Sequence, residues 1–190
     1  DDSAQENDNQ TLVAIGSNVI SSVQRTKNSV YIGNNVLTGF SGGSSRITDN
    51  VMIGNNACAN KGAVGGITAI GSSVGNSTAA INSTLVGYQA NGGTYAVSIG
   101  YQAGGAENNT SVGSFAGAAA GQGGVYVGYE AGVNINNGLA DDNIFIGSRT
   151  GKKDTTGSNL TNTKNTILIG HDAHGTAGGT DEIVIGHDAS

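Results

Sequence analysis

Two His-Asp pairs near the end of the chain are the residues best suited to chemistry. They are His171-Asp172 and His187-Asp188, and each pair follows a glycine that is itself preceded by Ile. Imidazole nitrogens and carboxylate oxygens are ordinary ligands for divalent metal ions. The four residues are therefore candidate metal ligands. The alternative is that they are exposed turn residues, because other copies of the same pattern hold uncharged pairs such as Asn34-Asn35 there.

Two pairs of adjacent acids, Asp141-Asp142 and Asp181-Glu182, are the candidates for carboxylate catalysis beyond the N-terminal segment. A depolymerase could use two convergent carboxylates to cleave a glycosidic bond. Each pair lies in an expected loop, however, and neighbouring side chains of an extended chain point apart. We therefore expect no enzymatic activity, no catalytic residue and no cofactor. A polysaccharide-cleaving spike is the alternative function.

A short repeat must position these residues, because a glycine preceded by Ile or Val recurs through the chain. We call it the anchor glycine and number the other positions of each copy from it. The anchors are Gly16, Gly33, Gly54, Gly71, Gly87, Gly100, Gly113, Gly128, Gly147, Gly170 and Gly186. Repetition at this short period is typical of a solenoid, in which each copy stacks on the next. The fold class that we expect is all-β, a parallel β-solenoid of about eleven short rungs over residues 11–190, with residues 1–10 as a leader or linker.

The composition of each position predicts which way its side chain points. Position −1 is Ile or Val, position −3 is Val, Ile or Thr, and position +3 is Ala, Val or Thr in every copy. Position −2 varies freely, from Ala14 to Tyr31 and Ser98. Alternation of this kind indicates a strand with −3 and −1 on one face and −2 on the other. We interpret the restricted face as the interior, so that Ile99→Asp should prevent folding and Ser98→Asp should be tolerated.

The spacing of the anchors indicates where loops leave the coil. Successive anchors are 17, 21, 17, 16, 13, 13, 15, 19, 23 and 16 residues apart. The shortest spacing should be one minimal coil, and the longer ones carry loops at 40–49, 139–142 and 152–162. Binding groups are often found on loops that a rigid scaffold holds. The sequence therefore predicts that receptor contacts involve Arg46, Asp49, Arg149, Lys152 and Lys153.

The copy Asn28-Ser29-Val30-Tyr31-Ile32-Gly33 resembles the head repeat of YadA-like trimeric autotransporter adhesins. The segment Gly100-Tyr101-Gln102-Ala103-Gly104 is similar to glycine-rich repeats of phage tail fibres. These resemblances cover nearly the whole chain from about residue 11, and they imply a homotrimer that attaches a bacterium or a virion to a host-cell glycan or protein. The irregular coil length departs from the nearly constant repeat of the adhesin heads. That departure favours the tail fibre over the bacterial surface adhesin.

Composition limits the possible partners further. The formal net charge is −6 with only 8 Lys and Arg, so a nucleic-acid backbone is not an expected partner. No apolar run is long enough for insertion into a membrane. The single cysteine, Cys58, allows no intrachain disulfide, and we expect it to be small buried filler. We expect an extracellular protein, on a virion or a bacterial surface. A purely structural extracellular filament subunit is a further alternative.

Overall fold

The computed structural model describes residues 11–19, 26–38, 47–58, 65–75, 81–118, 120–133, 142–151, 164–176 and 180–190. The described residues form strands and turns and contain no helix. The strands are β1 (Leu12–Ser17), β2 (Thr26–Lys27), β3 (Ser29–Asn34), β4 (Ile47–Thr48), β5 (Val51–Asn55), β6 (Thr68–Ile70), β7 (Thr84–Val86), β8 (Val97–Ile99), β9 (Thr110–Val112), β10 (Val125–Val127), β11 (Ile144–Ile146), β12 (Ile167–Ile169) and β13 (Ile183–Ile185). No helix of the described residues is long and apolar enough to cross a membrane.

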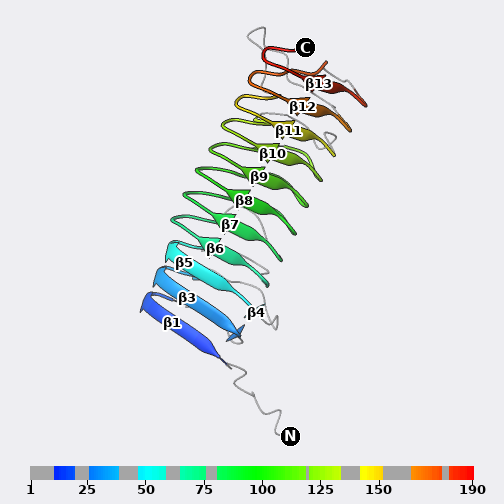
Figure 1. Ribbon diagram of the computed structural model, residues 1–190. Coiled ribbons are helices and arrows are strands. Elements are labelled where there is room, and N and C mark those ends of the chain that lie inside the picture. The colour runs from blue at the N-terminus through cyan, green and yellow to red at the C-terminus, as the bar shows by residue number, and fades with distance from the viewer. Residues whose placement is uncertain are drawn as a thin grey trace, which may run out of the picture.

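Eleven of these strands stack into one parallel sheet, one strand for each anchor glycine. The order is β1-β3-β5-β6-β7-β8-β9-β10-β11-β12-β13, and β2 pairs with β4 in a second, two-stranded parallel sheet. Figure 1 shows the result, a coiled stack with β1 and β13 at its two ends. Parallel neighbours joined in chain order, one coil apart, make a β-solenoid. The expected all-β parallel solenoid is therefore confirmed.

Register places the same motif position in one column along the stack. Ile32 pairs with both Ile15 and Ile53, and Gly33 pairs with both Gly16 and Gly54. Anchor glycines have φ near +140°, for example +140° at Gly100. A Cβ added at Gly100 would collide with the carbonyl oxygen of Gly113 in the next rung. Glycine is required there because each corner lies directly on the corner of its neighbour.

A second corner lies five residues before each anchor, and the sequence analysis missed it. Its residues have φ of +50° or more and are mostly Asn, Asp or Gly: Thr11, Asn28, Asp49, Gly66, Asn82, Tyr95, Asn108, Gly123, Asp142, Asn165 and Asp181. These side chains suit a left-handed backbone. They also bond along the column, since Asn28 Nδ2 donates to Asp49 Oδ1 over 3.1 Å. The composition of position −5 was the signal that could have revealed this corner.

The two faces of each strand are the reverse of the sequence-based interpretation. Position −2 is fully buried in nine rungs: Tyr31, Met52, Ala69, Leu85, Ser98, Ser111, Tyr126, Phe145 and Leu168 are each 0% exposed. Ile99, at position −1, is 39% exposed. Restricted composition was taken as a sign of burial, but the variable position is the interior one. The expectation that Ile99→Asp would be worse than Ser98→Asp was therefore wrong.

In two rungs a large interior side chain faces a glycine on the opposite wall of the coil. A Cβ added at Gly132 would collide with the ring of Tyr126, and one at Gly151 would collide with the ring of Phe145. In these two rungs the ring at −2 therefore lies against a glycine four residues after the anchor, whereas Tyr31 shares its rung with the buried Leu37 at the same position. Packing to the density of a protein interior requires such matching.

Small residues at position +3 point inward. Those at 0% exposure are Val36, Ala57, Val74, Ala90, Ala103, Ala116, Ala131, Thr150 and Ala173. Position −4 is also interior, and its asparagines satisfy the backbone of the next rung: Asn109 Oδ1 accepts from the Gly124 N–H at 2.7 Å. Cys58 is 1% exposed, so the expectation that it is buried is confirmed.

Candidate functional site

The face of the sheet that points away from the coil is a continuous surface of β-branched side chains. We call it the outer wall, and it consists of positions −3 and −1 in all eleven rungs. Its residues are Val13, Ile15, Val30, Ile32, Val51, Ile53, Thr68, Ile70, Thr84, Val86, Val97, Ile99, Thr110, Val112, Val125, Val127, Ile144, Ile146, Ile167, Ile169, Ile183 and Ile185. None of them is buried.

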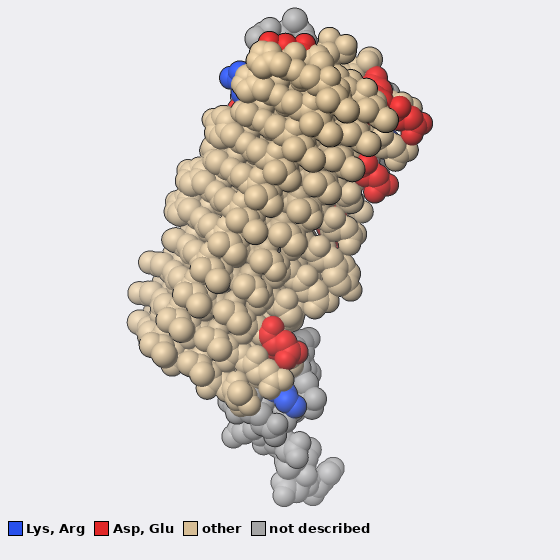
Figure 2. Space-filling model, viewed as in Figure 1, with Lys and Arg blue, Asp and Glu red and all other residues tan. Residues whose placement is uncertain are grey.

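The outer wall is apolar without being covered by any described part of the chain. Ile70, on β6, and Ile146, on β11, are each 38% exposed, so the wall is open to solvent at widely separated rungs. The wall includes no charged residue. In the view of Figure 2 the middle of the visible face is free of Lys, Arg, Asp and Glu, which gather towards the ends and one edge. An uncharged apolar strip of this length is unusual on a monomer.

An exposed row of aromatic rings borders the outer wall at the corner that follows it. We call it the aromatic border. The rings of Tyr88 and Tyr101 stack at 5.3 Å, and Tyr101 meets Phe115 edge-on at 5.2 Å. Phe115 continues to Tyr129 at 6.5 Å. The rung spacing of a parallel sheet holds these rings within contact distance of one another. Tyr101 belongs to the segment that resembles tail-fibre repeats, but this stack of rings was not predicted from the sequence.

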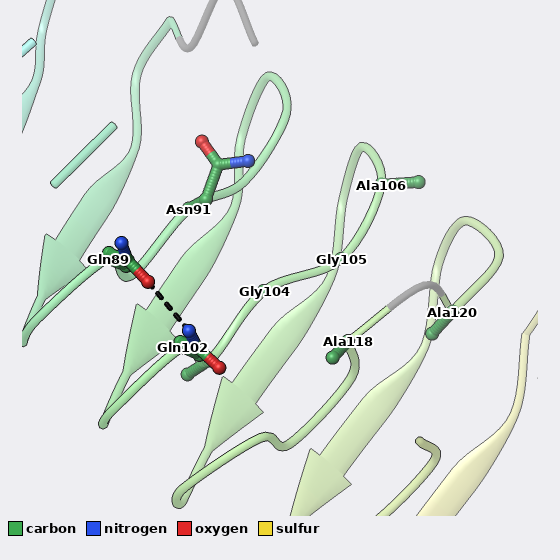
Figure 3. A pocket seen from close by; sticks show the side chains of 9 residues that line it. Gln89, Asn91, Gln102, Gly104, Gly105, Ala106, Ala118 and Ala120 are labelled. Atoms are coloured by element: carbon green, nitrogen blue, oxygen red, sulfur yellow. Dashed lines mark hydrogen bonds between the residues drawn. The ribbon is translucent and has the colours of Figure 1, made fainter. Parts of the chain in front are cut away.

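A shallow groove follows the same rungs on the other side of the corner (Figure 3). It has a volume of about 440 Å³ and is lined by Gln89, Asn91 and Gln102 above a floor of Gly and Ala residues between 103 and 120. Gln102 Nε2 donates to Gln89 Oε1 over 2.6 Å. The groove lies where the anchors are only 13 residues apart, so these coils contain no long loop of their own. Amide groups in a row can exchange hydrogen bonds with hydroxyl-rich ligands.

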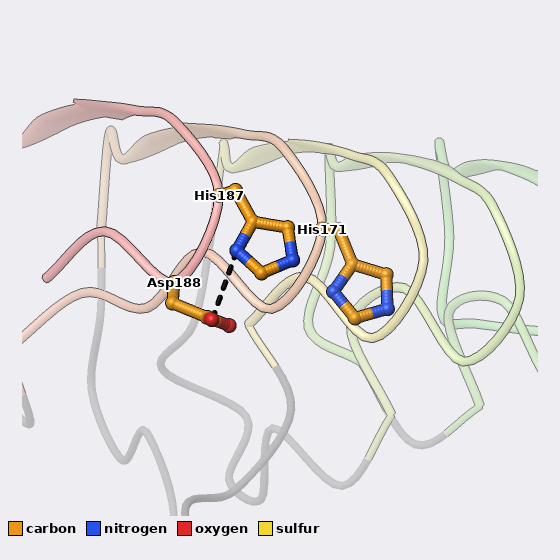
Figure 4. A group of neighbouring side chains, drawn as sticks. All are labelled: His171, His187 and Asp188. Carbon is orange, nitrogen blue, oxygen red and sulfur yellow. Dashed lines mark ion pairs between the residues drawn. The ribbon is translucent and has the colours of Figure 1, made fainter.

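The two His-Asp pairs lie on neighbouring rungs at the C-terminal end of the described stack. Figure 4 shows His171, His187 and Asp188. The imidazoles of His171 and His187 stack at 5.0 Å with 8° between their planes. His187 Nδ1 lies 2.9 Å from Asp188 Oδ2, and His171 Nδ1 lies 3.1 Å from Asp172 Oδ2. One ligand atom from each of His171, His187 and Asp188 lies within 4.8 Å of the other two.

Asp172 is paired with an arginine of the preceding rung. Arg149 Nε donates to Asp172 Oδ1 over 2.8 Å, and Arg149 Nη2 donates to Asp172 Oδ2. These hydrogen bonds hold the pKa of Asp172 below its usual range, against a smaller opposing effect of burial. They also raise the pKa of Arg149. The carboxylate of Asp172 is therefore engaged, whereas Asp188 has no arginine partner among the described residues.

The predicted receptor contacts are spread over the stack. Asp49 occupies the second corner between β4 and β5, and Arg149 lies after β11 in the pair with Asp172. Five strands of the sheet separate β5 from β11, so the structure does not bring these two residues together. Arg46, Lys152 and Lys153 lie outside the described residues.

The acidic pairs do not converge where they are described. Asp181 is exposed at the second corner and accepts from Asn165 Nδ2 over 3.0 Å. Glu182 occupies the interior position −4, and its Oε2 accepts from the Thr176 N–H over 2.9 Å. The two side chains therefore leave the strand on different sides. Asp142 lies at an exposed corner, and its neighbour Asp141 is outside the described residues.

No protein-family model matches the chain, and no curated protein or solved structure matches it either.

Proposed function

We propose that this chain is a non-enzymatic segment of a trimeric fibre or adhesin that attaches a particle or a cell to a host-cell surface. The observation that carries the proposal is the uncovered outer wall. Eleven rungs about 4.8 Å apart make it about 50 Å long, and its two columns span roughly 350 Å² in projection. Burial at about 25 cal/mol per Å² would stabilise an association by on the order of 9 kcal/mol per face before the costs of binding.

A second copy of the chain is the partner that fits the wall best. Another copy has the same rung spacing, so the rungs of the two stacks can stay in register along the whole wall. No charge of the wall would have to be desolvated in such a contact. A partner of different repeat would lose this fit within a few rungs.

The position of the aromatic border favours closure as a trimer. Each chain presents two different apolar surfaces that meet at a corner, the outer wall and the border of Tyr88, Tyr101, Phe115 and Tyr129. Contact between unlike surfaces is heterologous, and it closes into a ring when the rotation permits. Three copies around one axis make the smallest such ring beyond a dimer. All three chains then point the same way, which suits a fibre.

Attachment is proposed for the surfaces that remain outside this trimer. The amide groove of Gln89, Asn91 and Gln102 is uncharged and suits polar ligands such as glycans. The likeness to adhesin heads and tail-fibre repeats supports the same function and an extracellular location on a virion or a bacterial surface. It rests on short motifs, so it supports the architecture more strongly than the identity of the receptor.

Light scattering coupled to gel filtration tests the assembly. The chain should elute with three times its monomer mass, and Ile99→Lys together with Ile146→Lys should dissociate it. The control is Gln122→Lys together with Thr176→Lys, which adds the same charge at exposed sites off the wall. A folded monomer at micromolar concentration would contradict the proposal, as would equal effects of the two double variants.

A glycan array probed with the intact oligomer tests attachment. We expect binding to a limited set of surface glycans that is weakened by Gln89→Ala and Gln102→Ala. An oligomer that binds neither glycans nor host cells would favour the purely structural filament. Release of sugars from a bound polysaccharide would favour the cleaving spike.

A further inference from the structure

Two of the three histidines of this chain lie one above the other. His171 and His187 each follow an anchor glycine directly, and the register Ile169↔Ile185 places their rungs side by side. The rings stack at 5.0 Å and are nearly parallel (Figure 4). The third histidine, His174, lies on the same rung as His171 but not in this column.

Among the residues that the structure describes, one carboxylate beside these rings has no arginine partner. Asp172 receives two hydrogen bonds from Arg149, which already balance its charge. Asp188 occupies the same corner position one rung further, with φ of +50° against +51° at Asp172. Its Oδ2 lies 2.9 Å from His187 Nδ1. The structure therefore separates the four sequence-predicted ligands into three that converge and one that is paired elsewhere.

We propose that His171, His187 and Asp188 bind a divalent ion of the first transition series. One ligand atom from each residue lies within 4.8 Å of the others. Two imidazoles and a carboxylate suit Co²⁺, Ni²⁺, Cu²⁺ and Zn²⁺ better than the oxygen-seeking Mg²⁺ or Ca²⁺. Three protein ligands leave coordination positions for water or for a group from a partner.

Binding requires a small rearrangement of the two rings. Bonds of about 2.1 Å hold the ligand atoms of one ion roughly 3 Å apart, so the three groups must draw closer than in the free chain. Parallel rings also direct their nitrogen lone pairs along parallel lines, and at least one ring must turn. The side chains of His171 and His187 are 44% and 70% exposed, which leaves room on the solvent side for this turn.

The test uses the intact chain prepared without a polyhistidine tag. It is titrated with Co²⁺, followed by the visible absorption of the bound ion, and with Zn²⁺, followed by calorimetry. We expect one ion per chain, a loss of affinity of at least tenfold in His171→Ser and in His187→Ser, and a several-fold loss in Asp188→Asn. Serine should preserve the fold, because Ser148 occupies the corresponding position of the preceding rung.

His174→Ser is the matched control, since it removes a histidine of the same rung and should leave binding unchanged. The proposal is overturned if neither metal binds at millimolar concentration. It is also overturned if the double variant His171→Ser with His187→Ser binds as tightly as the parent chain. All three ligands come from one chain, so a failed trimer and a failed metal site give separate results.

Discussion

Ser98 and Ile99 are adjacent on β8 and lie on opposite sides of the sheet. Ser98 is fully buried, and Ile99 is 39% exposed on the outer wall. The Oγ of Ser98 has no hydrogen-bond partner in the described structure. This pair of neighbours shows most directly which face of each strand is the interior.

Ser98→Asp should therefore be much more destabilising than Ile99→Asp. It buries a carboxylate without a partner, at a cost on the order of 2–7 kcal/mol in the free energy of unfolding. Ile99→Asp should keep the strand content of the chain and act on association. Urea unfolding followed by circular dichroism measures the difference. Ser98→Ala is the control and should be neutral or slightly stabilising, because it removes an unpaired buried hydroxyl. Equal losses from the two aspartates would contradict the assignment of the faces.

Gly100→Ala should destabilise the stack strongly. The added Cβ would collide with the carbonyl oxygen of Gly113, and the φ of +140° at this position is strained for any other residue. We expect a loss of at least about 3 kcal/mol in the free energy of unfolding. Gly65→Ala is the matched control, since the nearest atom to its added Cβ is the Thr48 carbonyl oxygen at 3.9 Å. Thermal unfolding of the two variants should separate them by many degrees.

Phe145 and Gly151 should be energetically coupled. Phe145→Ala leaves a cavity that costs about 3–5 kcal/mol, and Gly151→Ala places a methyl group against the ring of Phe145. In the double variant that methyl group enters the cavity. The double variant should therefore lose less free energy of unfolding than the sum of the losses in the two single variants, by about 0.5–3 kcal/mol. Chemical denaturation of the four proteins gives this coupling, and strict additivity would mean that the opposite walls do not compensate.

Removal of Arg149 should raise the pKa of Asp172. In the folded chain the hydrogen bonds from Arg149 lower this pKa. The pair therefore stabilises the fold at pH values above the pKa that the carboxyl has in the unfolded chain. The contribution is lost as the pH falls through the lower pKa of the folded state. Solvent screens this partly exposed pair, so its effect on stability should be small. Carboxyl resonances followed by NMR during an acid titration measure the shift. An unchanged pKa of Asp172 in Arg149→Gln would contradict the role of the pair.

The columns that stack could be predicted from the sequence because a parallel sheet repeats its register in every rung. The Ile-Gly and Val-Gly steps mark the strand ends, whatever the length of the loop between them. The inward direction of position +3 and the alignment of His171 above His187 follow from that repetition. The burial of Cys58 was expected from its residue type. Composition and motif spacing thus determined the architecture and the placement of most candidate residues.

Which face of the strand turns inward was decided only by the tertiary structure. A period of two shows that positions −3 and −1 share a face, but it is the same whether that face is covered by the coil or by another molecule. The second corner, at Asn28 and its equivalents, bends the chain so that positions −4 and −2 line the interior. The pairing of Asp172 with Arg149 likewise depends on two corners 23 residues apart in the chain meeting on adjacent rungs. The partner of each side chain is determined by contacts between rungs and not by the order of residues within a single rung.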